Sequence, residues 1–429
     1  MARVVLSTFG SAGDLNPFVA LGLRLRERGH EVVFAVEENF QPAVRALGFA
    51  VTTLSGDSAT ALGPYARRVF ASGNALASLR LLLRHYILPT LPAKIAELCA
   101  ACEGADLLVA AASQLAASAA VDLTGVRWAS VVVGPSTLPS AHIEAQPVPF
   151  ALPQAMRMAS NRLEWALGGA ALRRMVDRPV NRIRAGFGLA PRHDLMWTGN
   201  LAPAGTAVAV SPAFLARPPD WPRYVHMTGF CFWDGATGWN APPDLTAFLD
   251  TTDPIVAVTA GSIAPEVEEA FAPYFYASVA AIRAHGGRAL VVGVSPSIAA
   301  DLRGEGVLTL PFAPYSVVFP RCAAVIHHAG IGTVAQCLRA GVPALVVPGG
   351  LDQPFNAARV ARLGVGVWRS RRGFTAERAT KALGALLGES GYRERARELA
   401  GAIAREDGTG ALSVVVESTL KLDLPRGRT

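Results

Sequence analysis

Two glycine-rich stretches carry residue types that could do chemistry, and the first is "TFGSAGDLNP" at Thr8–Pro17, directly after the apolar run "VVLS". A glycine-rich loop between a strand and a helix usually receives a phosphate, because the free helix N–H groups and the helix dipole attract anions. This loop instead contains a carboxylate, Asp14, with Asn16 as the expected helix N-cap and Pro17 as the expected first helical residue. Asp14 would repel a phosphate, so the loop needs another role. The simplest one, an acid stabilised by the positive end of the helix, stays open.

The second stretch is "AAVIHHAGIGTVAQCLRAGVPALVVPGG" at residues 323–350. It predicts a strand over 323–328, a tight turn, and a helix over 333–340 whose N-terminus is open to an anion because the preceding residues are small. Adjacent residues of a strand point to opposite faces, so His327 and His328 cannot easily share one metal ion. We expect one histidine to pack in the core and the other to reach a phosphate at the carboxyl end of the strand.

The elements around both stretches alternate between strand and helix. The strand patterns are nearly continuous apolar runs, as in buried parallel strands, so the chain is predicted to be α/β with doubly wound sheets. With 429 residues it is too long for one core, and a Pro-rich connector separates two similar halves. The expected division is residues 1–225, a linker at 226–245, residues 246–410, and a C-terminal helix and tail at 411–429 that could pack on either half.

The amino-acid composition limits the kinds of molecule that the protein is expected to bind. The net charge of +7 comes almost wholly from arginine, yet no basic run is dense enough for nucleic acid, so a phosphorylated small molecule or an anionic membrane surface fits better. The sequence shows no secretory signal and no run able to span a bilayer, and it has an odd count of five cysteines. These features predict a cytoplasmic, reduced chain, with contact to the inner face of a membrane left open.

The C-x-x-C at Cys99 and Cys102 is interpreted as structural, with a redox pair as the alternative.

The stretches "HHAGIGT…AGVPALVVPGGLDQPFNA" and "GSAGDLNP" resemble the donor motif and the acceptor-side loop of family 1 nucleotide-sugar glycosyltransferases. The resemblance covers nearly the full length. It implies the GT-B fold, in which two Rossmann-like domains face each other across a cleft. It also implies sugar transfer from a nucleoside-diphosphate sugar to an acceptor hydroxyl. No D-x-D occurs in the sequence, so we expect neither a metal nor another cofactor.

Carried over by motif position, His328 would contact the pyrophosphate together with the amides of Gly332 and Thr333, while Asp352 and Gln353 would hold sugar hydroxyls. Asp352 could also serve as a helix N-cap, and the two roles could coexist. The remaining donor-side residues implied by the resemblance are Ser11, Ser262, Phe312, Ala313, Gly330 and Gln336. Phe312 takes the place of a tryptophan that stacks on the base, and Tyr315 replaces a glutamine. Gln336 replaces a ribose-binding glutamate.

On the acceptor side, the resemblance implies that Asp14 is the base that removes the proton of the attacking hydroxyl, where many members have a histidine. The resulting reaction would be a single displacement with inversion. Three looser likenesses, "GPSTLPSAH" among them, are similar to rhamnosyltransferases of rhamnolipid synthesis. They imply dTDP-rhamnose or a UDP- or dTDP-hexose as donor, a hydroxyalkanoyloxy fatty acid as acceptor, and acceptor contacts by Ser136, Thr137, His142 and Phe150.

Other functions stay open. A sterol, a polyketide or another natural-product aglycone is the alternative acceptor, and a sugar-nucleotide epimerase or a non-catalytic accessory protein is more remote. A nucleotide-dependent oxidoreductase would need G-x-G-x-x-G after a strand, which the first loop lacks.

Leucines at helical spacing near Leu76–Ile87 and seven arginines in Arg157–Arg184 favour an apolar acceptor near an anionic membrane surface. Ordinary core packing and a solvated basic helix are the alternatives.

Overall fold

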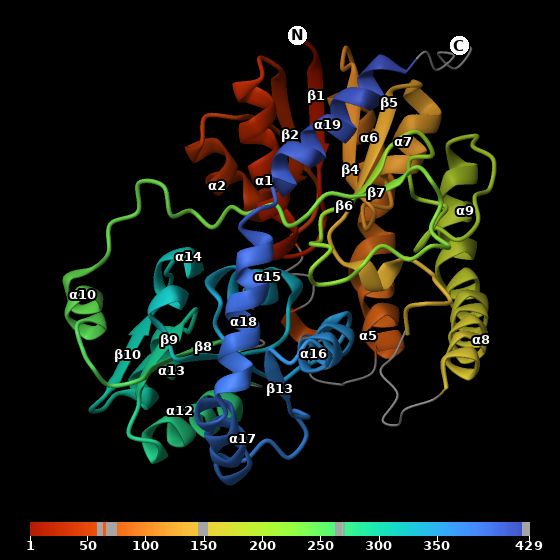
Figure 1. Ribbon diagram of the computed structural model, residues 1–429. Helices are drawn as coiled ribbons and strands as arrows, with labels where there is room; N and C mark the ends of the chain where they lie inside the picture. Colours follow the sequence, from red (N-terminus) through yellow and green to blue (C-terminus); the bar gives the residue numbers. More distant parts are fainter. Residues whose placement is uncertain (58–62, 66–74, 145–152, 262–267, 269–270, 423–429) are drawn as a thin grey trace. The chain divides into compact units, whose positions relative to one another are not determined.

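The computed structural model divides the chain into two compact units (Figure 1). Unit 1 comprises Met1–Leu62, Leu79–Phe232 and Glu406–Thr429, and unit 2 comprises Gly63–Ser78 and Trp233–Arg405. The residues that the structure describes are 1–57, 63–65, 75–144, 153–261, 268 and 271–422. Within these residues, no helix combines the length and the apolar character needed to cross a bilayer.

Unit 1 is built on a seven-stranded sheet in the order β3-β2-β1-β4-β5-β6-β7, with every neighbouring pair parallel. Its strands are β1 (Arg3–Ser7), β2 (Glu31–Glu37), β3 (Ala50–Leu54), β4 (Leu107–Ala111), β5 (Arg127–Val132), β6 (Thr206–Val208) and β7 (Val225–Met227). The first 260 residues contain helices α1 (Ala12–Glu27), α2 (Gln41–Ala46), α5 (Ala75–Leu82), α6 (Leu88–Ala101), α7 (Ala117–Thr124), α8 (Gln154–Leu172), α9 (Arg178–Gly186) and α10 (Pro243–Leu249). The π-helical turns η3 (Leu83–Ile87) and η5 (Arg173–Asp177) join α5 to α6 and α8 to α9.

Unit 2 is built on a six-stranded parallel sheet in the order β10-β9-β8-β11-β12-β13. Its strands are β8 (Ile255–Thr259), β9 (Arg288–Val292), β10 (Val307–Leu310), β11 (Ala324–His327), β12 (Ala344–Val346) and β13 (Gly366–Trp368). The helices after β8 are α12 (Ala272–Ala284), α13 (Pro296–Leu302), α14 (Tyr315–Val318), α15 (Ile331–Ala340), α16 (Gln353–Arg362), α17 (Ala376–Gly388), α18 (Ser390–Ile403) and α19 (Gly408–Lys421). The predicted α/β class with two doubly wound sheets is confirmed.

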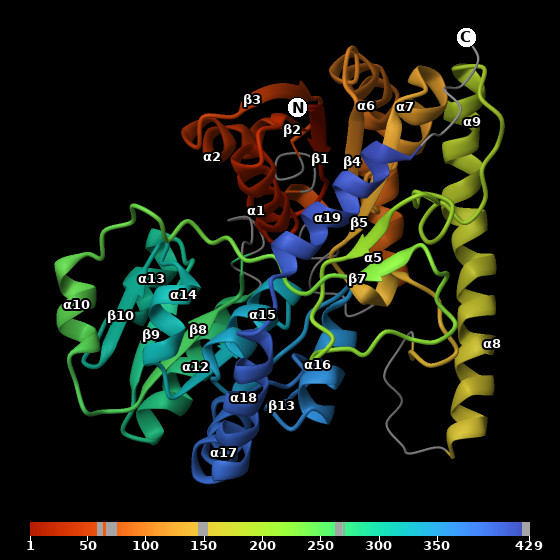
Figure 2. The ribbon, with the colours of Figure 1, turned by 45° about the horizontal axis from the view of Figure 1, so that its top comes forward.

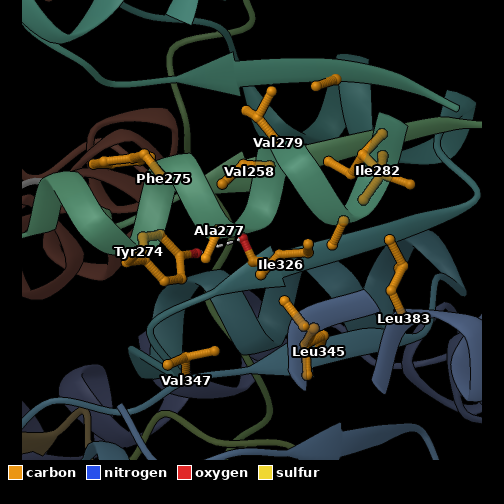
Figure 3. Packing of buried hydrophobic residues seen from close by; sticks show 14 of the residues in the cluster. Val258, Tyr274, Phe275, Ala277, Val279, Ile282, Ile326, Leu345, Val347 and Leu383 are labelled. Atoms are coloured by element: carbon orange, nitrogen blue, oxygen red, sulfur yellow. Dashed lines mark hydrogen bonds between the residues drawn. The ribbon is translucent and has the colours of Figure 1, made fainter. Parts of the chain in front are cut away.

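The core of unit 2 shows why its strands read as unbroken apolar runs. Figure 3 shows side chains of α12 lying on side chains of the sheet, among them Val258 of β8 and Ile326 of β11. Tyr274 of α12 is buried, and its hydroxyl donates to the backbone oxygens of Ile326 at 2.9 Å and Thr259 at 3.0 Å. These bonds fix α12 across the ends of β8 and β11, the two strands at which the strand order reverses.

The last helix, α19, packs on unit 1, which settles the alternative that the sequence left open. The carboxylate of Glu417 accepts two hydrogen bonds from the Arg28 guanidinium, at 2.6 and 2.7 Å, and lies 3.2 Å from the His30 ring. At the start of this segment, Glu406 accepts a 2.7 Å bond from the hydroxyl of Ser211. The chain therefore returns to its first unit after completing the second.

Helix α1 begins earlier than predicted. Ser11 is the N-cap and Ala12 the first helical residue, so Asn16 and Pro17 lie inside the helix and the prediction that they start it was wrong. The reason is local: the backbone oxygen of Ser11 already accepts the amides of Asp14 and Leu15, at 2.9 and 3.2 Å. Asp14 is thus the third residue of a helix and not a member of an open loop.

Candidate functional site

In unit 1, the carboxylate of Asp14 lies at the carboxyl end of β1, where the strand order reverses between β1 and β4. One of its oxygens, Oδ2, accepts the amide of Ser11 at 2.7 Å and the hydroxyl of Ser11 at 3.0 Å. Burial raises the pKa of Asp14 above its usual value, and the two bonds from Ser11 oppose that rise. A carboxylate with a raised pKa, held through its other oxygen by Ser11, is suited to accept a proton.

The loop before Asp14 is held by residues that the sequence did not single out. Gly10 has a φ of 133°, and a side chain there would overlap the carboxylate of Asp14. From the loop after β4, Gln114 donates to the Ser7 hydroxyl at 3.2 Å and to the Thr8 oxygen at 3.4 Å. The Thr8 hydroxyl in turn donates to the backbone oxygen of Asp14 at 3.3 Å. The base is thereby fixed from two neighbouring strand ends.

A small hollow opens beside this loop. Phe9, Ile87, Leu91 and Leu115 supply apolar walls, and Thr90, Lys94, Ser113 and Gln114 supply polar groups. Because the walls come from η3, α6 and the loops after β1 and β4, the hollow lies at the edge of the sheet that also holds Asp14. Its volume of about 10 Å³ is room for about one water molecule, so the lining offers apolar and polar contacts without enclosing a ligand.

Two of the predicted acceptor residues lie at the same edge of the sheet. Ser136 and Thr137 form a short turn after β5, two strands from β1, which corresponds to about 10 Å at the usual strand spacing. His142 is exposed, and the segment before it is held by Asp220, which accepts the Ser140 hydroxyl and the Ala141 amide, each at 2.7 Å. Phe150 lies outside the described residues.

In unit 2, the two histidines divide as expected. His327 ends β11 fully buried, and its Nδ1 accepts the amide of Ala329 at 3.1 Å. His328 is partly exposed, and its enclosed Nδ1 has no hydrogen-bond partner among the described residues. Burial lowers the pKa of His327 to about 3 and that of His328 to about 4, so both rings are neutral at physiological pH. His328 is therefore a neutral group that can donate one hydrogen bond.

Two glycines hold the His328 ring. A β-carbon built at Gly261, after β8, or at Gly330, after β11, would overlap the imidazole. Gly261 also has a φ of 76°, whereas Gly330 has a φ of −60° that any residue can adopt. The ring thus lies at the reversal between β8 and β11, the position in this sheet equivalent to that of Asp14 in the other.

Helix α15 starts directly beside this ring. Gly330 is its N-cap, and Gly332 and Thr333 are in its first turn, two residues earlier than the predicted start. The first N–H groups of a helix have no partner within the helix and carry its positive dipole end. The structure therefore brings His328, Gly330, Gly332 and Thr333 together at the N-terminus of α15, an arrangement that suits an anion, while Ser262 lies outside the described residues.

The motif "DQPFN" closes over the same turn. Asn356, which the sequence reasoning left without a role, is fully buried and donates to the Ala329 oxygen at 3.0 Å and to Oδ2 of Asp352 at 2.8 Å. Gln353 accepts the Gly349 amide at 2.8 Å. Asp352 holds the N-cap position of α16, although its side chain caps no backbone N–H there. Asn356 thus orients the carboxylate of Asp352 at the start of α16.

The predicted base-stacking residue is open to solvent. Phe312 is 51% exposed, next to buried Ala313, and it lies near Gly235. Tyr315 stacks on Phe319 at 4.4 Å and bonds the Thr259 hydroxyl at 2.8 Å, so it is occupied within the unit. An exposed aromatic ring offers a face on which a nucleobase can stack.

Gln336, expected at the ribose, makes a contact that sequence reasoning missed. Its side chain is 6% exposed and donates to Oδ2 of Asp234 at 3.3 Å. Asp234 also accepts the amide of Ser316 at 2.7 Å and its hydroxyl at 3.1 Å. The only sequence signal was an acid within the Pro- and Gly-rich connector, which also contains other aspartates.

Comparison with known proteins supplies the family. Residues 4–116 match the glycosyltransferase family 28 N-terminal domain, and residues 296–409 match the erythromycin biosynthesis protein CIII-like C-terminal domain. O-mycaminosyltylonolide 6-deoxyallosyltransferase of Streptomyces fradiae is 34% identical over 97% of both chains. This chain belongs to the family 1 glycosyltransferases.

Further relatives of this glycosyltransferase agree. Glycosyltransferase GtfE of Amycolatopsis orientalis is 30% identical over 96% of this chain and 97% of its own length. A sterol 3-beta-glucosyltransferase of Leptosphaeria maculans is 27% identical over 99% of this chain but only 29% of its own length. Two solved structures, each 21% identical, show the same GT-B fold. Spinosyn rhamnosyltransferase SpnG has a TM-score of 0.68 over 97% of this chain and 100% of its own. Glycosyltransferase VinC in complex with dTDP has a TM-score of 0.67 over 97% of this chain and 99% of its own.

The structure of the glycosyltransferase also bears on a metal site and on a redox-active cysteine pair. Among the described residues, no group of three or more His, Cys, Asp and Glu side chains could hold a metal ion. Its five cysteines are free, and burial raises the pKa of Cys102 to about 12 and raises that of Cys99. A thiol of raised pKa is a poor nucleophile, so the C-x-x-C is best explained as part of the α6 packing.

Proposed function

We propose that this glycosyltransferase transfers a hexose, most fittingly a deoxyhexose, from a dTDP- or UDP-sugar to a hydroxyl of an apolar natural-product aglycone. One observation carries the assignment of roles to the two halves. Both sheets place a functional loop at the reversal of strand order, but unit 1 has a carboxylate there and unit 2 has a neutral histidine beside open helix amides. Only the second loop suits a diphosphate.

The reaction that fits these groups is one displacement. Asp14 takes the proton of the acceptor hydroxyl while the acceptor oxygen bonds to the anomeric carbon. The bond from that carbon to the diphosphate oxygen breaks, and the leaving nucleoside diphosphate is stabilised by the N-terminus of α15 and a hydrogen bond from His328. The product then has the anomeric configuration opposite to that of the donor.

The acceptor is best placed among macrolide-like or related aglycones. The relative from Streptomyces fradiae is named for a tylonolide acceptor and a deoxyallosyl donor, and the solved neighbours include a spinosyn rhamnosyltransferase and a dTDP complex. They favour the aglycone alternative over the hydroxyalkanoyloxy fatty acid that the sequence suggested. The hollow at Phe9, Ile87 and Gln114 has a volume of only about 10 Å³, so it offers a mixed apolar and polar contact surface and not the space for a whole aglycone. A sterol is the second candidate, because sterol 3-beta-glucosyltransferases are also relatives.

One panel tests the proposal. The protein is incubated with dTDP-rhamnose, other dTDP-deoxyhexoses and UDP-glucose, each with a macrolide aglycone, a sterol, a hydroxyalkanoyloxy fatty acid or no acceptor. Mass spectrometry should detect a glycosylated aglycone, and NMR should show inversion at the anomeric carbon. Conversion of the donor without an acceptor would indicate an epimerase, and binding without any product would indicate an accessory protein. Preferred glycosylation of the fatty acid would instead support the hydroxyalkanoyloxy fatty acid as the acceptor.

A further inference from the structure

The long helix of unit 1 formed by α8, η5 and α9 is held by one face. Figure 2 shows α8 and α9 following one another as a long helical segment. From the inner face, Asn161 donates to the Ala141 oxygen and Trp165 to the Ile143 oxygen, both at 2.9 Å. In the π-helical turn, buried Asp177 accepts the amides of Asp194 and Leu195 at 2.8 and 3.1 Å. These contacts leave the opposite face to solvent.

The N-terminal half of that outer face is apolar. Met156, Leu163 and Leu167 are 58%, 60% and 64% exposed. Their spacings of seven and four residues place all three on one side of the helix. Large apolar side chains this exposed, repeated along one helix face, mark an interaction surface more often than a solvated one.

The C-terminal half of the same face is basic. At about 100° per residue, Arg174 and Arg178 continue the line of Leu163 and Leu167. They line a surface groove of about 730 Å³ together with Arg173, Asn181, Arg182 and His193. Arg173 is paired with Asp194 at 2.8 Å, whereas no ion pair is formed by Arg174, Arg178 or Arg182 within the described part of the chain.

One acid, Asp177, also lines this groove, but it is buried and its carboxylate accepts the amides of Asp194 and Leu195. Of the exposed residues between 155 and 185 none is acidic, because Asp177 is buried and Glu164 is half-buried. Not every arginine contributes: Arg184, counted with the others in the sequence, is 1% exposed and paired with Asp122. The free cations are thus concentrated on the side of the helix that also carries the exposed leucines.

We propose that this outer face docks the protein on an anionic phospholipid surface, with Met156, Leu163 and Leu167 inserted among the acyl chains and Arg174, Arg178 and Arg182 on the lipid phosphates. A helix lying in the plane of a bilayer interface can place apolar side chains among the acyl chains and arginines at the level of the headgroups. Anionic headgroups supply the charge that the arginines lack within the fold. The proposal is independent of the acceptor, since it concerns the outer face of unit 1 and not the strand ends.

Vesicle co-sedimentation of the full chain tests it. The probes are vesicles of phosphatidylcholine alone and of phosphatidylcholine mixed with phosphatidylglycerol. We expect binding to the mixed vesicles only, weakening as salt rises. Arg174→Ala/Arg178→Ala should weaken that binding about thirtyfold, from two basic residues near the surface. The matched control, Arg303→Ala/Arg405→Ala, removes the same charge from exposed residues of unit 2 and should bind like the parent.

A second double variant distinguishes a lipid surface from a second copy of the chain as the partner of this face. Leu163→Ser/Leu167→Ser should also lose vesicle binding while keeping the thermal unfolding midpoint, because both side chains are exposed. Three results would overturn the proposal: absence of binding to mixed vesicles, equal binding of the Arg174/Arg178 variant and the parent, or a dimer in light scattering that the leucine substitutions dissociate in a protein that ignores vesicles. The last would assign the face to a second copy of the chain.

Discussion

The side-chain amide of Gln336 donates to the carboxylate of Asp234, and the two residues are 102 positions apart in the sequence. Asp234 belongs to the first residues of unit 2, and it also accepts hydrogen bonds from Ser316 in α14, the short helix that follows the exposed Phe312. The pair therefore joins the entry of the chain into unit 2 to the helix whose N-terminus suits an anion. A family glutamate at position 336 would bring a second carboxylate to within about 3 Å of Asp234, so the glutamine and the aspartate belong together.

The first prediction concerns a negative charge added at position 336. Gln336→Glu should weaken binding of dTDP or UDP at pH 8, because two adjacent carboxylates repel and the loop carrying Phe312 shifts. The loss should shrink as the pH falls and one of the two carboxylates is protonated. Isothermal titration calorimetry measures both effects. Adding Asp234→Asn to this variant should restore affinity at pH 8. A Gln336→Glu protein that binds normally at that pH would mean that the contact does not hold the nucleotide loop.

The second prediction concerns Asp14. Asp14→Asn should keep nucleotide affinity and lose about two to four orders of magnitude in turnover, the usual contribution of a general base. Burial raises the pKa of Asp14 above 3.8, and the base must be ionised, so kcat/KM should fall with decreasing pH at a value above 3.8. That acidic limb should vanish in the residual activity of the variant. Near-normal turnover in a folded Asp14→Asn protein would leave Asp14 only as a charge at the start of α1.

The third prediction uses Gly330. Its backbone angles suit alanine, so Gly330→Ala should fold normally, but the new β-carbon would displace the His328 ring. Loss of one hydrogen bond to a charged group is worth about 1.5–3 kcal/mol, so nucleoside-diphosphate affinity should fall by roughly one to two orders of magnitude. His328→Ala should lose a similar amount, and the double variant should lose no more than either single one. Additive losses would show that Gly330 acts through something other than His328.

Removal of divalent metal is the fourth prediction. The charge on the leaving diphosphate is balanced by the α15 N-terminus and His328, and the described residues offer no cluster of metal ligands. Initial rates should therefore be unchanged after dialysis against EDTA and should not rise when Mg²⁺ is restored. A strict dependence on Mg²⁺ would contradict the metal-free reaction.

Local patterns explain what the sequence could predict. Asp14 and His328 follow strands whose apolar runs are unmistakable, so their positions at strand ends could be derived before any coordinates. The early start of α1 also had a signal, an acid three residues after Ser11, but the Asn16–Pro17 pair was the more familiar one. Asp234 had no such pattern, because its partners are far away in the sequence and meet it only after the sheet of unit 2 has formed. The docking of α19 is similar, since Arg28 and Glu417 are 389 residues apart.

The last prediction tests the buried pair beneath the acceptor hollow. Lys94 donates to Glu37 at 2.7 Å and to the Tyr86 hydroxyl at 3.2 Å, with only 4% and 2% of the Lys94 and Glu37 side chains exposed. Lys94→Met would leave the Glu37 carboxylate buried without its cation. We expect the free energy of unfolding at pH 7 to fall by about 3–5 kcal/mol.

A double variant and a kinetic measurement decide what this pair contributes. Lys94→Met/Glu37→Leu removes both charges, and urea denaturation should show that it recovers most of the stability lost by Lys94→Met alone. Turnover should stay reduced in both variants, because the Lys94 ammonium lies 5.3 Å from the ring of Phe9, which directly precedes the Gly10–Asp14 segment. Full activity in the double variant would mean that the pair stabilises the fold without positioning the base. Continued low activity in a stable double variant would show that Lys94 also fixes the loop on which Asp14 depends.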